Sequence, residues 1–222
     1  MKSLVELSGV SAGYDRRTVF REANLTIREE DFIGIVGPNG GGKTTLLKVV
    51  LGLLKPYSGQ VTYHTSPRQS LFGYLPQNGQ FDTRFPICVE EVVLSGLLSR
   101  KGLLKRYTRQ DRVQANELLT AYGMGGYANA LIGELSGGQM QRVFLCRAII
   151  SSPRLLILDE PATYVDSQFE KEFYIILEGL NKQMSVVMVS HDLDAMTTYI
   201  KTLVRVDRGV VTVEETKTGE KP

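Results

Sequence analysis

The chain has 222 residues, with 26 basic and 24 acidic side chains and a formal charge of +2. Its 42% hydrophobic and 23% charged residues are typical of a folded globular domain and exclude a disordered or collagen-like chain. The near-neutral charge gives no reason to expect a nucleic-acid partner. The length allows one substantial core.

Apolar runs are short throughout the sequence. Runs such as 155–158 and 186–189 are the size of a strand, far from the roughly 20 residues of a membrane-spanning helix. The N-terminal segment has no apolar stretch of signal-peptide length. We therefore expect the chain to stay in the cytosol.

Cysteine and histidine are rare in this chain. Cys88 and Cys146 lie far apart without a C-x-x-C motif, so we expect small buried side chains and no disulfide. His64 and His191 are the two histidines, which is too few for a zinc-type ligand cluster.

Secondary structure is predicted to change character along the chain. Strands are expected first and last, and helices in the middle. The predicted strands are 4–7, 18–20, 24–27, 32–36, 61–63, 71–75, 155–158, 185–189, 203–206 and 210–213. The predicted helices are 43–54, 88–98, 108–122, 140–150 and 167–180. Alternating strands and helices predict an α/β fold with a mainly parallel sheet and an inserted helical part.

A glycine-rich turn follows the apolar run 32–36 and precedes a predicted helix. It fits G-x-x-x-x-G-K-[ST], the pattern of a phosphate-binding loop. Glycines let successive backbone N–H groups surround phosphate oxygens, and the helix N-terminus adds partial positive charge. Lys43 is expected to reach the β- and γ-phosphates, and Thr44 to bind Mg²⁺. The loop consists of Gly37, Pro38, Asn39, Gly40, Gly41, Gly42, Lys43, Thr44 and Thr45.

Two carboxylates end the apolar run 155–158. Ligands bind at the carboxyl edge of open α/β sheets, so Asp159 is predicted to hold Mg²⁺, directly or through water. Side chains alternate along a strand, so Glu160 points elsewhere and is free to orient or deprotonate an attacking water. His191 follows the buried run 186–189 and is expected to contact the γ-phosphate or that water. Gln77, after the strand 71–75, is expected to reach Mg²⁺ or the water.

A second glycine motif precedes the helix predicted at 140–150. Ser136 suits a helix N-cap, and two glycines expose backbone N–H groups beside it. This makes a second anion site, without a lysine or metal ligand of its own. It consists of Ser136, Gly137, Gly138 and Gln139.

Taken together, these motifs resemble the ATP-binding subunit of an ABC transporter over essentially the whole chain. Residues 37–45 match the Walker A motif, and residues 135–139 match the LSGGQ signature. Further matches are the Walker B aspartate Asp159, the catalytic glutamate Glu160, the Q-loop Gln77, the switch histidine His191, the D-loop Asp166 and the adenine-stacking Tyr14.

The resemblance implies a P-loop NTPase (RecA-like) fold with an N-terminal antiparallel β subdomain and an inserted helical subdomain. It implies a single nucleotide-binding domain over 1–222, with a catalytic core at about 1–80 and 150–222 and the helical subdomain at about 81–149. ATP and Mg²⁺ are the implied cofactors. Two copies would pair head to tail, each signature acting on the ATP of the other. The implied partners are an integral membrane permease and, indirectly, a substrate-binding protein, at the cytoplasmic face of a bacterial cell membrane.

Two positions depart from the family pattern. Gly41 stands where many relatives have Ala or Ser, a conservative change because only backbone is needed there. Tyr164 stands after the glutamate where the family has a small residue, and it is expected to touch the partner subunit or to pack.

The segments 85–94, 102–112 and 132–139 are similar to those of bacterial zinc and manganese importers. Related ATPases for iron chelates or haem share much of this region. Ion specificity would lie in partner proteins. Soluble ABC ATPases of DNA repair or translation are an alternative, but they carry a long coiled coil or two nucleotide domains. A phosphotransferase or a GTPase is a third possible class, but proteins of these classes lack the signature motif.

A basic stretch runs from the end of the predicted helix 88–98 into the first turns of the predicted helix 108–122. It reads either as a solvated helix face or as a surface near the membrane protein or anionic lipid. Its members are Arg100, Lys101, Lys105, Arg106, Arg109 and Arg112, with the single acid Asp111 among them.

Overall fold

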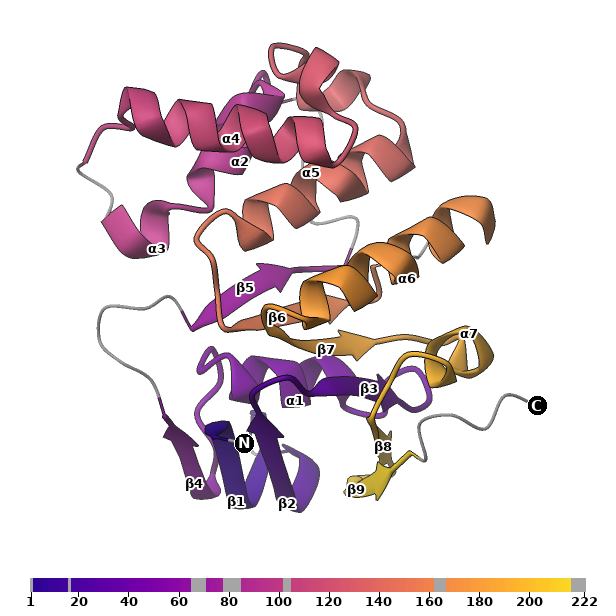
Figure 1. Cartoon of the computed structure of the whole chain (residues 1–222). Coiled ribbons are helices and arrows are strands. Elements are labelled where there is room, and N and C mark those ends of the chain that lie inside the picture. The colour runs from indigo at the N-terminus through magenta and orange to yellow at the C-terminus, as the bar shows by residue number, and fades with distance from the viewer. Residues whose placement is uncertain are drawn as a thin grey trace.

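The structure, a computed structural model, describes residues 2–15, 17–64, 71–77, 85–101, 105–161 and 167–216. Two sheets and a group of helices build it (Figure 1). The strands are β1 (Ser3–Tyr14), β2 (Arg17–Arg28), β3 (Phe32–Val36), β4 (Ser58–Tyr63), β5 (Phe72–Leu75), β6 (Leu155–Asp159), β7 (Ser185–Val189), β8 (Thr202–Asp207) and β9 (Val210–Glu215). The α-helices are α1 (Lys43–Val50), α2 (Val89–Ser95), α3 (Leu98–Lys101), α4 (Arg109–Ala121), α5 (Gly137–Ile149), α6 (Ser167–Asn181) and α7 (Leu193–Thr197), with 3-10 turns at Gly125–Tyr127 and Ile132–Glu134.

The larger sheet has the order β5-β6-β7-β3-β8-β9. All of its neighbours are parallel except β8 and β9, which form a hairpin around Arg208-Gly209. The smaller sheet, β2-β1-β4, is antiparallel. This arrangement confirms the predicted fold class.

Strand alternation divides the core into two layers. In β6, Leu155 and Ile157 face a cluster shared with α1 and the antiparallel sheet, whereas Leu156 and Leu158 face α5 and α6. The side chains of β3, β6 and β7 are buried throughout, as expected for parallel strands covered on both faces. Their carboxyl ends therefore meet at one edge.

The helices α2, α3, α4 and α5 gather at the end of the molecule away from β1, β2 and β4 (Figure 1). Helices α2, α4 and α5 enclose a third cluster around Val93, Leu119 and Val143. None of the helices in the part of the chain described is long and apolar enough to cross a membrane.

Several element bounds differ from the prediction. The runs 18–20 and 24–27 form one strand, β2, in which Glu22 has a φ of 50° where the pairing register with β1 shifts. Helix α1 ends at Val50 instead of residue 54, because Gly52 adopts a left-handed φ of 72°. The predicted helix 88–98 divides into α2 and α3 at Gly96, a poor helix former. Helix α5 begins at Gly137, so the signature glycines form its first turn.

Two members of the basic stretch have structural partners. Lys101 and Asp111 form an ion pair, and Arg112 and Glu90 form another. Asp111 also accepts hydrogen bonds from the backbone N–H and the hydroxyl of Thr108, at 2.6 and 2.7 Å. These contacts cap α4 and join it to α2 and α3.

Candidate active site

The turn 37–42 joins the buried strand β3 to α1. Lys43 is buried, and its Nζ donates to the carbonyls of Gly37 and Pro38 at 2.9 and 3.2 Å. The ammonium group therefore lies inside the loop, where phosphate oxygens would meet it. A side chain at Gly37, where φ is 152°, would place a Cβ 2.0 Å from the carbonyl oxygen of Val206 in β8. The loop is thus packed directly on the end of a neighbouring strand.

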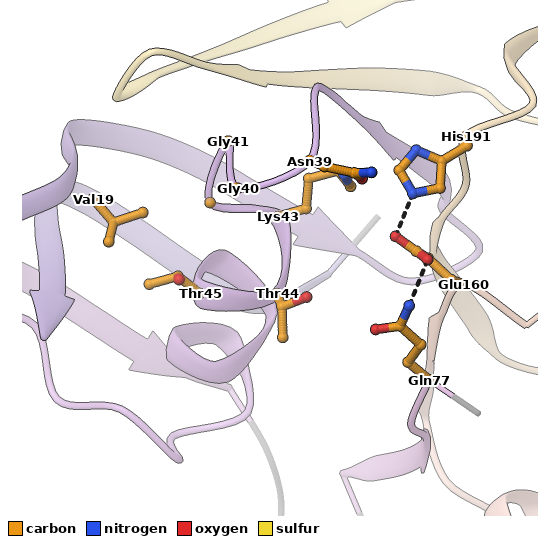
Figure 2. A pocket seen from close by; sticks show the side chains of 11 residues that line it. Val19, Asn39, Gly40, Gly41, Lys43, Thr44, Thr45, Gln77, Glu160 and His191 are labelled. Atoms are coloured by element: carbon orange, nitrogen blue, oxygen red, sulfur yellow. Dashed lines mark hydrogen bonds and ion pairs between the residues drawn. The ribbon is translucent and has the colours of Figure 1, made fainter. Parts of the chain in front are cut away.

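A cavity of about 580 Å³ opens over this loop (Figure 2). The phosphate loop forms one wall, and three polar side chains from the ends of other strands form the opposite wall. Its lining residues are Val19, Asn39, Gly40, Gly41, Gly42, Lys43, Thr44, Thr45, Gln77, Glu160 and His191.

Glu160 lies between Gln77 and His191 (Figure 2). Gln77 Nε2 donates to Glu160 Oε2 at 2.8 Å, and His191 Nε2 lies 2.6 Å from Glu160 Oε1. Glu160 has a φ of 52°, the left-handed region that non-glycine residues adopt rarely and that is often seen at functional sites. The contacts of Gln77 and His191 with Glu160 went unforeseen, because sequence separations of 83 and 31 residues give no sign of them.

Asp159 is the last residue of β6, and its side chain contacts Thr44. The Thr44 hydroxyl is hydrogen-bonded to its carboxylate, and burial, the largest influence, raises the pKa of Asp159 despite that bond. Its second oxygen, Oδ1, is buried and has no hydrogen-bond partner among the described residues. An unpaired carboxylate oxygen beside a threonine hydroxyl fits a hard cation such as Mg²⁺. No group of three or more His, Cys, Asp or Glu in the described ranges makes a separate metal site.

Other predicted site residues lie outside the cavity lining. Ser136 caps α5, accepting from the Gln139 N–H at 3.4 Å, while Gln139 Oε1 accepts from the Ser136 N–H at 2.9 Å. Tyr14 is 42% exposed at the end of β1, and Lys48 Nζ stands 5.6 Å from its ring centroid. Asp166 and Tyr164 fall outside the described residues.

The ABC transporter family model matches residues 20–163. The chain belongs to the ABC transporter family. A zinc uptake system ATP-binding protein, ZurA of Listeria monocytogenes, is 37% identical over 95% of this chain and 85% of its own length. A manganese transport system ATP-binding protein, MntB of Bacillus subtilis, is 40% identical over 88% of this chain and 80% of its own length.

Solved structures agree with this membership. A metal-chelate type ABC transporter in an inward-facing conformation matches with a TM-score of 0.88 and 25% identity, over 97% of this chain and 84% of that one. A dimeric ATP-binding cassette in a post-hydrolysis state with ADP and Pi matches with a TM-score of 0.82 and 25% identity, over 97% of this chain and all of that one. This ABC protein is an ATPase whose hydrolysis of ATP is coupled to transport.

Proposed function

We propose that this ABC ATPase drives import of a metal ion, zinc or manganese, through a separate membrane permease. The observation that carries the proposal is identity of 37% and 40%, along nearly the whole chain, to ATP-binding proteins named for zinc and manganese uptake. The permease and a second copy of this chain would be its direct partners, and a substrate-binding protein an indirect one. The work would take place at the cytoplasmic face of a bacterial cell membrane.

Within the domain, the loop from Gly37 to Thr45 binds the phosphates of ATP. The Lys43 ammonium turns from two loop carbonyls toward the β- and γ-phosphates, and loop N–H groups hold the oxygens. Tyr14 stacks on the adenine. Bound Mg²⁺ would neutralise phosphate charge, held by Thr44, Asp159 and Gln77.

Glu160 is the general base in this proposal. It takes a proton from the attacking water as the water's oxygen bonds to the γ-phosphorus and the bond to the β-phosphate oxygen breaks. Gln77 and His191 support this role by holding both oxygens of the Glu160 carboxylate, at 2.8 and 2.6 Å. A fixed carboxylate orients the water at small entropic cost.

The signature motif acts on the partner's nucleotide. Its residues Ser136, Gly137, Gly138 and Gln139 do not line the phosphate cavity of their own chain. Their position at the N-terminus of the 13-residue helix α5 supports an anion contact made in trans. Asp166 would contribute to the same interface. The chain would act as one nucleotide-binding domain, with a catalytic core at about 1–80 and 150–222 and a helical subdomain at about 81–149.

The test is uptake of radiolabelled zinc and manganese by a strain that lacks this chain. Wild-type protein should restore uptake of one of the two metals, and Glu160→Gln should not, although it still binds ATP. Glu178 is an exposed carboxylate on α6, so Glu178→Gln is the matched control and should restore uptake fully. Restoration of iron-chelate or haem uptake alone, or of no uptake, would overturn the assignment of the substrate.

A further inference from the structure

The basic stretch 100–112 contains two kinds of side chain. Lys101 is paired with Asp111. Arg112 is paired with Glu90, so these two cations are neutralised within the helical group. The other four cationic side chains are exposed and form no ion pair or hydrogen bond with any of the described residues. They make up the basic patch, which consists of Arg100, Lys105, Arg106 and Arg109.

The ion pair between Lys101 and Asp111 gathers the basic patch at one corner of the molecule. Lys101 ends α3, and Asp111 lies in the first turn of α4, so their contact holds these two helix ends together. Arg100 directly precedes Lys101, and Arg109 is the first residue of α4, with the other two members shortly before it. The end of α3 and the start of α4 lie on the same outer side of the helical group (Figure 1).

Along the chain, the basic patch is short of free negative charge. Asp111 and Glu90 are already paired, and the next exposed acid of α4 is Glu117, about two turns beyond Arg109. Val113, one turn beyond Arg109, is 48% exposed and adds an apolar side chain to the same helix face. Four unpaired like charges beside an exposed apolar group are typical of a surface that binds a membrane containing anionic lipid.

We propose that the basic patch binds the anionic lipid surface of the membrane beside which this ATPase works. A protein partner would have to offer carboxylates at fixed positions, whereas a layer of lipid headgroups supplies mobile phosphates that long exposed side chains reach without a preformed cavity. Each cation near such a surface should raise the affinity roughly fivefold. The proposal takes only the presence of a membrane from the proposed function and does not depend on which metal is carried.

The test is sedimentation of the purified full-length chain with lipid vesicles. One set of vesicles contains phosphatidylglycerol and phosphatidylcholine in equal parts, and the other set contains phosphatidylcholine alone. Wild type should bind the first set and not the second. Binding should weaken steeply as the salt concentration rises, because ions screen charges that lie more than about 8 Å apart at physiological ionic strength.

Two variants of equal net charge separate the basic patch from general electrostatic attraction. In the patch variant, glutamine replaces all four members, and the affinity for the phosphatidylglycerol vesicles should fall on the order of a hundredfold. In the control variant, glutamine replaces four exposed lysines elsewhere, and the affinity should stay close to that of wild type. Both variants should keep wild-type ATP turnover in the absence of lipid. The substitutions are Arg100→Gln, Lys105→Gln, Arg106→Gln and Arg109→Gln in the patch variant, and Lys2→Gln, Lys55→Gln, Lys171→Gln and Lys182→Gln in the control.

Equal vesicle binding by the patch variant and wild type would overturn the proposal. So would an equal loss in both variants, since net charge alone would then explain the binding, or a wild type that does not bind phosphatidylglycerol vesicles. A patch variant that binds these vesicles normally but no longer co-purifies with the permease would assign the basic patch to a protein contact instead. The vesicles contain neither permease nor metal, so failure of the proposed metal uptake would leave this result unchanged.

Discussion

Replacement of Gly37 by alanine tests whether the phosphate loop depends on its packing against β8. The added Cβ would lie 2.0 Å from the carbonyl oxygen of Val206 and 3.0 Å from its carbonyl carbon. Both are backbone atoms of a central strand, so the loop itself has to move. The φ of 152° at this position is also one that side chains disfavour.

Two contributions set the size of the effect. Backbone strain at a disfavoured φ costs about 1–3 kcal/mol, and forced displacement of packed atoms costs about 1–3 kcal/mol more. The free energy of unfolding should therefore fall by about 2–6 kcal/mol. The carbonyl of Gly37 also accepts from Lys43, so a displaced loop should weaken ATP binding as well.

Urea denaturation and ATP titration, each on the purified chain, measure the two effects. Gly179→Ala is the matched control, because Gly179 lies within α6 and a Cβ there would meet nothing within 4 Å. That variant should be more stable by about 0.5–1 kcal/mol, with unchanged ATP affinity. If Gly37→Ala were as stable as wild type and bound ATP equally well, the packing account of the loop would be wrong.

Two further predictions concern a helix cap and the adenine. Hydrogen bonds from Lys101, first, and from Thr108 hold the pKa of Asp111 at about 2, below that of an unfolded aspartate. Asp111→Asn should therefore lower the free energy of unfolding by about 1 kcal/mol at pH 7. Denaturation at a series of pH values should show that this difference between variant and wild type vanishes as the pH falls from about 4 toward 2. A difference independent of pH would contradict the assignment. Tyr14→Ala should raise KM for ATP roughly tenfold through lost stacking, with little change in thermal stability because Tyr14 is 42% exposed. An unchanged KM would remove Tyr14 from the nucleotide site.

The sequence was most informative where local pattern and chemistry coincide. The apolar runs 155–158 and 186–189 became central parallel strands, because only strands covered on both faces are apolar at every position. The position of Lys43 and Asp159 at the sheet edge follows from the same alternation of strand and helix.

Four features were not predicted from the sequence pattern. Helices α2 and α3 are separate around Gly96, and the bulge in β2 reflects the left-handed backbone of Glu22. The contact of Glu160 with both Gln77 and His191 requires three strand ends to converge. The ion pair between Lys101 and Asp111 depends on how the end of α3 meets the start of α4, which helical periodicity alone does not reveal.

The central claim is that two copies form each ATP site, the phosphate loop from one and the signature motif from the other. The most direct measurement mixes two inactive variants, Lys43→Ala and Ser136→Arg, and follows phosphate release. A mixed pair has one complete site only if the signature acts in trans. Random pairing should then restore about a quarter of wild-type turnover, because half the pairs are mixed and each has one complete site of two. If the mixture remained as inactive as its separate components, the account of a shared site would be contradicted.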